Sequence, residues 1–143
     1  MRLVLIIGTV LWLGGCSHSC KKPIPGTITI TAESEANQFS AVAIDIVTAR
    51  DPSLVNQLSA LKSQEYFALR SQLLKDFPAT MVVTGWEITP GQVLEKGTLT
   101  YACDAEATYI FASYNTKGEH RVKLAKKERL SIVLRTYDFE VDQ

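Results

Sequence analysis

The sequence predicts a mainly β protein, a β-sandwich with one helical excursion after its second strand. Three observations lead to this fold class. Short segments alternate between apolar and polar residues, as in residues 27–31, and turn-forming residues separate them. Residues 52–77 instead carry apolar side chains at helical spacing. Further alternating segments follow from residue 81 to the end of the chain, and regularly spaced short strands of this kind indicate two packed sheets.

The chain begins in the form of a bacterial export signal. Arg2 precedes a mostly apolar run, residues 3–13, which is shorter than the roughly 18 residues that a membrane span needs. The sequence Leu-Gly-Gly-Cys at residues 13–16 resembles a bacterial lipobox. We therefore expect residues 1–15 to be a lipoprotein signal peptide and Cys16 to become the first, lipidated residue. The alternative is an ordinary signal peptide with an incidental cysteine.

Cys16 is the expected membrane anchor. Its thiol would carry a diacylglyceryl group and its amine a third acyl chain, and at about 0.8 kcal/mol per buried methylene these chains hold firmly in a bilayer. Ser17 stands where an Asp would favour retention, so we expect sorting to the outer membrane, with the protein facing the periplasm. Residues 16–26 are predicted to form a lipidated tether, and residues 27–143 the β-sandwich domain. We expect no cofactor besides this covalent lipid.

Two other cysteines, Cys20 and Cys103, would lie in the oxidising periplasm. A disulfide between them would close a long loop and could contribute roughly 4 to 5 kcal/mol in the chain-entropy description. The alternative is two separate thiols. The sequence leaves both open, because it does not reveal whether the two Cα atoms lie close enough to be bridged.

Residues 27–31 alternate strictly between threonine and isoleucine, which predicts a first strand with both isoleucines on one face. Small and polar residues interrupt this pattern over residues 33–40. Alternation resumes in residues 42–48, which predicts the second strand.

The pair Asp-Pro at residues 51–52 has the form of a helix start. An Asp side chain accepts hydrogen bonds from free amide groups, and Pro at the first helical position loses no hydrogen bond. An apolar stripe follows over residues 54–61. Ser63 is expected to cap a second helical segment, which the Phe-Pro pair at residues 77–78 ends.

The rest of the chain returns to β character. A turn at residues 90–92 and a hairpin loop at residues 115–118 separate alternating segments, and Lys96-Gly97 predicts a break within one of them. The predicted strands cover residues 81–88, 93–102, 108–114 and 121–124, and alternation continues in residues 130–134 and 137–141.

The composition argues against several classes of function. The chain has 15 basic and 15 acidic residues, whereas a nucleic-acid-binding protein would show a basic excess. The sequence signatures of zinc proteases, nucleophile-elbow hydrolases, dinucleotide-binding folds and phosphate-binding loops do not occur. We therefore expect no catalytic site, no metal site, no nucleic-acid partner and no small-molecule substrate.

Individual titratable residues are expected in solvated positions. His120 lies beside a predicted loop between a Glu and an Arg, which is typical of a surface histidine. Asp45 lies within a predicted strand, and Asp104 and Glu106 lie near a turn. These carboxylates have neither the number nor the spacing of oxygen ligands found in calcium loops.

Two surface features are candidate contact sites. Lys123, Lys126, Lys127 and Arg129 form a basic cluster that could favour anionic headgroups, with a solvated strand connection as the alternative. Phe39 lies in the otherwise polar connection between the first two strands. An exposed aromatic residue in such a loop can anchor a protein interface, and the alternative is that Phe39 folds back onto the edge of the sandwich.

Several features occur in a distinctive order along the chain. A lipobox and tether precede a strand, the Asn-containing loop at residues 36–40, a second strand and a helical stretch. A Pro-Gly turn at residues 90–91, the strand at residues 109–114 and closing strands follow. This order resembles the TssJ family, small outer-membrane lipoproteins of type VI secretion systems. The chain departs from that family in lacking a proline-bearing approach to the second strand and an Arg-containing strand followed by Gln-Leu.

The resemblance implies a transthyretin-like β-sandwich with a helical insertion after the second strand, and no catalysis. It also implies that the protein ties a secretion envelope complex to the outer membrane. The implied partner is the periplasmic domain of TssM, the large inner-membrane subunit, bound through the loop after the first strand. In this sequence that role falls on Asn37, Gln38 and Phe39.

Two other classes of lipoprotein remain as alternatives. The sequence Tyr-Ala-Cys at residues 101–103 is similar to the start of membrane-bound C-type lysozyme inhibitors, but residues 130–137 lack the glycine of their Ser-Gly motif. The other alternative is an unrelated envelope-assembly or pilotin-like lipoprotein.

Overall fold

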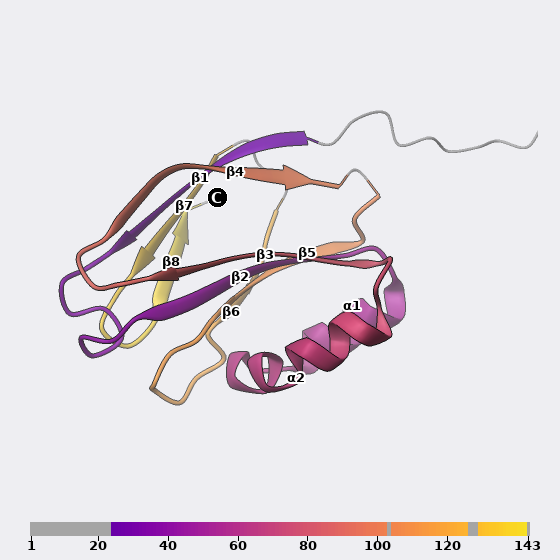
Figure 1. The fold of residues 1–143 in the computed structure, drawn as a ribbon, viewed down its shortest axis with the longest axis horizontal. Helices are drawn as coiled ribbons and strands as arrows, with labels where there is room; N and C mark the ends of the chain where they lie inside the picture. Colours follow the sequence, from indigo (N-terminus) through magenta and orange to yellow (C-terminus); the bar gives the residue numbers. More distant parts are fainter. Residues whose placement is uncertain (1–23, 103, 126–128, 143) are drawn as a thin grey trace, which may run out of the picture.

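The structure is a computed structural model that describes residues 24–102, 104–125 and 129–142. The predicted signal peptide, most of the predicted tether and the three cysteines Cys16, Cys20 and Cys103 lie outside the described residues. The described chain forms two stacked β-sheets with a pair of helices on the outer face of one of them (Figure 1).

The strands divide between two sheets of four. One sheet has the order β4-β1-β7-β8 and contains β1 (Ile24–Ala32), β4 (Val93–Tyr101), β7 (Arg129–Leu134) and β8 (Phe139–Asp142). The other has the order β3-β2-β5-β6 and contains β2 (Val42–Ala49), β3 (Met81–Ile88), β5 (Ala107–Ala112) and β6 (Arg121–Lys123). β1 pairs with β4 antiparallel and with β7 in parallel. This is the mainly β sandwich that the sequence predicts.

Most strand bounds agree with the prediction, and β1 and β4 differ from it. β1 begins at Ile24, within the segment assigned to the tether, because residues 24–26 pair with the end of β4. β4 continues through Gly97, where a break was predicted, and the β1–β4 ladder instead shifts register between Ile28 and Ile30. A Cβ atom on residue 97 would lie 2.6 Å from Cγ2 of Ile28. The glycine therefore permits a close approach of two strands and does not end the strand.

The main apolar core lies between the sheets. Ile28 and Ile30, the two isoleucines of the predicted first strand, face it as predicted, and Ile44 and Ile46 contact them from β2. Burial of such apolar surface contributes roughly 25 cal/mol per Å² and is the main stabilising term of the sandwich.

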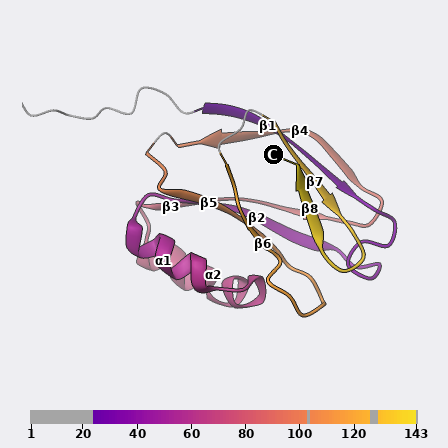
Figure 2. The same cartoon turned by 180° about the vertical axis from the view of Figure 1, so that it is seen from behind.

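Two helices cover the outer face of the β3-β2-β5-β6 sheet (Figure 2). They are α1 (Pro52–Ala60) and α2 (Ser63–Asp76), and a second apolar cluster fills the space between them and the sheet. In that cluster the Tyr66 ring stacks on Phe111 with 4.1 Å between ring centroids. β5 is consequently buried on both faces, which explains why its sequence is apolar or aromatic at every position except Thr108 and does not alternate.

The two helix starts have different caps. Asp51 caps α1 as predicted, because its side chain accepts hydrogen bonds from the backbone N–H groups of Ser53 at 2.7 Å and Leu54 at 3.2 Å. Ser63 does not cap α2, so that prediction was wrong. Its buried hydroxyl donates to the carbonyl oxygen of Ala112 at 2.7 Å and joins the helix to β5.

Candidate functional site

The loop between β1 and β2 contains a left-handed turn of three consecutive residues. Asn37, Gln38 and Phe39 have φ angles of 46°, 55° and 61°. L-amino acids avoid this region at a cost of about 1–2 kcal/mol per residue, and Asn tolerates it better than Gln or Phe. The backbone N–H of Ser40 closes the turn by donating to the carbonyl oxygen of Ala36 at 3.2 Å. Such a conformation persists only where the surrounding contacts impose it.

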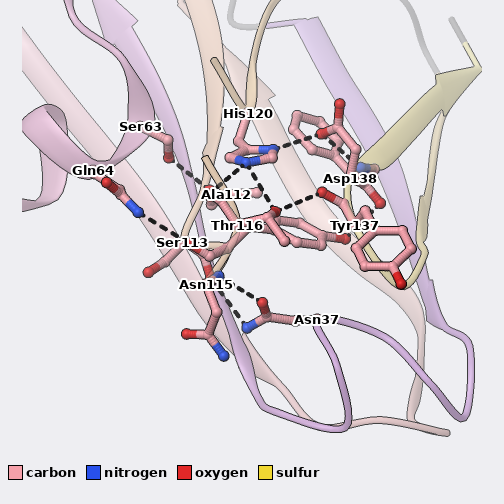
Figure 3. A network of polar contacts seen from close by, with 12 residues as sticks. Asn37, Ser63, Gln64, Ala112, Ser113, Asn115, Thr116, His120, Tyr137 and Asp138 are labelled. Atoms are coloured by element: carbon pink, nitrogen blue, oxygen red, sulfur yellow. Dashed lines mark hydrogen bonds and ion pairs between the residues drawn. The ribbon is translucent and has the colours of Figure 1, made fainter. Parts of the chain in front are cut away.

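The Asn37 side chain supplies several of those contacts. It is 1% exposed. Its Nδ2 donates to the carbonyl oxygen of Ala41 at 2.9 Å and lies 3.5 Å from that of Ser113. Its Oδ1 accepts a hydrogen bond from the backbone N–H of Asn115 at 2.7 Å (Figure 3). The side chain thus joins the turn to the connection between β5 and β6.

Backbone hydrogen bonds join the same loop to two further connections. The backbone N–H of Asn37 donates to the carbonyl oxygen of Arg135 at 3.0 Å, and that of Glu33 to Leu134 at 2.9 Å. The N–H of Gly91, in the β3–β4 turn, donates to the carbonyl oxygen of Glu33 at 3.2 Å. These connections lie together at the end of the sandwich where β1 finishes (Figure 1). The β1–β2 loop is therefore part of a firmly connected surface.

The predicted partner-binding residues take two different positions on this surface. Phe39 is 73% exposed, so it does not fold back onto the edge of the sandwich. Gln38 is also exposed. Asn37, in contrast, uses the polar groups of its side chain in hydrogen bonds within the protein. The buried Asn37 fixes the turn, and the turn directs Phe39 into solvent.

His120 is buried, contrary to the expectation of a solvated position. It is 4% exposed, and its ring stacks on Tyr114 with 4.9 Å between centroids. Nδ1 lies 2.9 Å from Oδ1 of Asp138, and Nε2 lies 3.1 Å from the carbonyl oxygen of Thr116 (Figure 3). Burial is the main cause that raises the pKa of Tyr114, whose hydroxyl donates to the carbonyl oxygen of Asp138 at 2.8 Å.

A hydroxyl, an imidazole and a carboxylate lie next to one another in the side chains of Thr116, His120 and Asp138. These are the groups of a catalytic triad in enzymes with a nucleophilic hydroxyl. The Thr116 hydroxyl, however, donates to the carbonyl oxygen of Tyr137 at 2.9 Å, so its hydrogen is already engaged. The imidazole is also enclosed by its partners. The arrangement joins the β5–β6 connection to the β7–β8 turn, and in it the Thr116 hydroxyl donates to a carbonyl oxygen and not to the imidazole.

Asp45 is also buried, contrary to the expectation of a solvated carboxylate. It is 4% exposed, on the face of β2 that the helices cover. Its Oδ2 accepts a hydrogen bond from the Tyr66 hydroxyl at 2.7 Å and pairs with Nε of Arg70. Burial, followed by the hydrogen bond to Asp45, raises the pKa of Tyr66, and the hydrogen bond to Asp45 raises the pKa of Arg70. This ion pair holds α2 against the sheet.

The remaining candidate residues lie at the surface or outside the described residues. Asp104 and Glu106 are exposed, and Asp104 pairs with Arg50 at 3.2 Å. Within the basic cluster, Lys123 and Arg129 are exposed, while Lys126 and Lys127 lie outside the described residues. The pairing of Cys20 with Cys103 and the lipidation of Cys16 fall on undescribed residues and stay predictions.

The described residues contain neither a metal-binding cluster nor a helix that could span a membrane. Within residues 24–102, 104–125 and 129–142, no group of three or more His, Cys, Asp or Glu side chains is arranged to hold a metal ion. Neither α1 nor α2 has the length and apolar character needed to cross a bilayer.

The chain is similar to several proteins of known structure. No protein-family model matches the sequence, and a search of curated proteins finds no match. The chain is similar to the type VI secretion system (T6SS) lipoprotein TssJ1 from Pseudomonas aeruginosa, with 16% identity, a TM-score of 0.64 and coverage of 84% of this chain and 95% of that one. It is also similar to Lip from Serratia marcescens, a membrane-bound component of the type VI secretion system, with 15% identity, a TM-score of 0.63 and coverage of 85% and 97%.

A third match is a chain in a structure described as the T6SS protein TssM C-terminal domain from EAEC. The identity is 13%, the TM-score is 0.61, and the match covers 83% of this chain and 98% of that chain. These likenesses extend over most of this chain and nearly the whole of each matched chain. The protein therefore has the β-sandwich fold, with added helices, of the T6SS lipoproteins TssJ1 and Lip, as its resemblance to the TssJ family predicts.

Proposed function

We propose that the protein is a periplasmic lipoprotein, anchored in the outer membrane through Cys16, that tethers a type VI secretion envelope complex. Its partner in this proposal is the periplasmic domain of a TssM-like inner-membrane subunit. The likeness to T6SS lipoproteins over most of the chain supports this class of function. The observation that carries the proposal is Phe39, an aromatic side chain that is 73% exposed on a firmly held turn.

The position of that turn suits a tether. β1 has nine residues, which at about 3.3 Å per residue extend roughly 30 Å. The strand starts at Ile24, shortly after the predicted anchor, and the turn that carries Phe39 follows its other end (Figure 1). The lipid and the proposed contact would thus lie at opposite ends of the sandwich, and the contact would extend away from the outer membrane.

The fixed backbone of the turn also supports binding. Association costs about 0.5–1.5 kcal/mol for each side chain that must be ordered, and loop ordering adds to this. The hydrogen bonds of Asn37 order the turn before any partner arrives. Exposed aromatic residues on such rigid segments are frequent anchors of protein interfaces.

The anchor is tested by fractionating cells that express the wild type or the Cys16→Ser variant. Wild-type protein should appear in the outer-membrane fraction, and mass spectrometry should find a mature chain that begins with a lipid-modified Cys16. Cys16→Ser should lose the lipid and leave the outer-membrane fraction. An unmodified thiol at Cys16 in wild-type protein would reject the anchor.

The partner is tested by capture of the purified periplasmic domain of the TssM-like subunit from the same cell on the lipid-free mature chain. Wild type should bind, and Phe39→Ala should weaken binding by about tenfold or more if Phe39 is an interface anchor. Leu69→Ala is the matched control, because Leu69 is an exposed apolar residue on α2. Unchanged capture by Phe39→Ala would reject the loop assignment, and absence of binding by wild type would reject the tethering function.

A further inference from the structure

We propose that Tyr137, with the cleft beside it, forms a second half of the partner-binding surface and receives a basic side chain of the TssM-like periplasmic domain. This inference rests on the proposed function and names the chemistry of the contact. Tyr137 is 64% exposed in the turn between β7 and β8. Like Phe39, Tyr137 is a large aromatic side chain that is exposed in a loop of the described chain.

The backbone that carries Tyr137 is held as firmly as the turn that carries Phe39. Its carbonyl oxygen accepts the hydrogen bond from the Thr116 hydroxyl at 2.9 Å. The carbonyl oxygen of the next residue, Asp138, accepts a hydrogen bond from the Tyr114 hydroxyl. The Asp138 carboxylate lies 2.9 Å from Nδ1 of the buried His120 (Figure 3). The His120 network therefore orders the β7–β8 turn and leaves the ring of Tyr137 in solvent.

The two exposed aromatic residues belong to adjoining segments. The backbone N–H of Asn37 donates to the carbonyl oxygen of Arg135 at 3.0 Å. Phe39 follows Asn37 in one loop, and Tyr137 follows Arg135 in the other, each after a single intervening residue. The segments that carry Phe39 and Tyr137 are therefore joined directly by a backbone hydrogen bond, which favours contact of both side chains with one partner.

The cleft beside Tyr137 has an acidic excess. It has a volume of about 420 Å³ and is lined by Glu33 and by residues 135–140 of the β7–β8 turn. The lining has three carboxylates, those of Glu33, Asp138 and Glu140, and one guanidinium, that of Arg135.

The Arg135 guanidinium is already engaged by carboxylates of the cleft. It pairs with Glu33 and forms two hydrogen bonds with Glu140, at 2.7 and 2.9 Å. The hydrogen bonds from Arg135 hold the pKa of Glu140 below its ordinary value, so this carboxylate stays charged at neutral pH. A surplus of negative charge beside an aromatic face favours a Lys or Arg side chain, through charge-assisted hydrogen bonds and cation–π contact. It disfavours an acidic or phosphorylated segment.

The test uses the same capture measurement with substitutions at two positions. Tyr137→Ala should weaken binding of the TssM-like domain by about fivefold or more, and Tyr137→Phe should keep wild-type binding because the ring remains. Glu140→Lys reverses one charge of the cleft and should also weaken binding by about fivefold or more, with the largest effect at low ionic strength. Thermal melts of each variant check folding, and Leu69→Ala is the control on α2.

The outcomes separate this inference from the proposed function. If Phe39→Ala abolishes capture while Tyr137→Ala and Glu140→Lys bind like wild type, the second half of the surface is rejected and the tethering function stands. If Tyr137→Ala weakens capture and Glu140→Lys does not, the basic occupant is rejected. If wild type fails to capture the domain, both proposals are rejected together.

Discussion

A Cβ atom on residue 85 would lie 2.4 Å from Oδ1 of Asp45, closer than real Cβ contacts allow. Gly85 on β3 faces Asp45 on β2 in the strand register. The other carboxylate oxygen is held by Tyr66 and by Arg70, so the carboxylate cannot move aside without breaking those bonds. The ion pair between the buried Asp45 and the half-buried Arg70 therefore requires a glycine at position 85.

Gly85→Ala is expected to lower the free energy of unfolding by about 1–3 kcal/mol, because the added methyl group overpacks the site of the Asp45 carboxylate. Urea denaturation measures this cost. In an Asp45→Ala background the same substitution should cost much less, since the clashing oxygen is gone. An equal cost in both backgrounds would mean that the clash with Asp45 is not its cause.

Tyr66→Phe should lower the free energy of unfolding by about 1–3 kcal/mol at neutral pH, because Asp45 loses a hydrogen-bond donor in a buried position. The substitution keeps the ring that stacks on Phe111, so loss of apolar burial contributes little. Leu69→Ala, on the exposed part of α2, gives the background effect of a substitution on this helix.

The cost of Tyr66→Phe should also depend on pH. Burial and the bond to Asp45 raise the pKa of Tyr66 above its ordinary value of 10.0, so the folded protein keeps the phenol neutral where the unfolded chain loses its proton. The contribution of the tyrosine is then fully present below about pH 10 and is lost as the pH rises above it. The stability difference between wild type and Tyr66→Phe should therefore shrink in alkaline solution. A difference that stays constant between neutral pH and about pH 11 would contradict the raised pKa.

Local patterning accounts for much of the fold. The alternation of β2, the β character of β3 and the Asp-Pro start of α1 each depend on residues close together in the chain, and their bounds agree with the prediction. The parallel pairing of β1 with β7 has no local signal, because it joins segments from opposite ends of the domain.

The buried polar residues were missed for the same reason. His120 looked like a surface residue because its neighbours are charged, and its burial depends on Asp138 in another turn. The partners of Asp45 come from α2, a separate element. For Phe39 the sequence left exposure and folding back onto the sandwich edge open, and the structure has it exposed. Its left-handed backbone was not foreseen because the turn contains no glycine.

Asn37→Ala is expected to lower the free energy of unfolding by about 1–3 kcal/mol, because it removes the hydrogen-bond partners that the buried amide offers to part-buried backbone groups of Ala41 and Asn115. Asn37→Asp tests the direction of these bonds. It keeps an acceptor for Asn115 but places an oxygen against the carbonyl oxygen of Ala41, so it should also destabilise. Thermal melts that match wild type for both variants would show that the amide does not hold the turn.

Gln38→Gly should raise the free energy of unfolding by about 1 kcal/mol, because glycine adopts a positive φ without the steric cost that Gln38 bears at 55°. Glycine also increases the entropy of the unfolded chain, which opposes the gain. Glu35→Gly isolates that opposing effect, since Glu35 is exposed in the same loop and is not among the residues with positive φ. Urea denaturation should then show opposite signs for the two substitutions. If both destabilise equally, the turn at Gln38 holds no strain that its contacts must offset, and the firm presentation of Phe39 would need another cause.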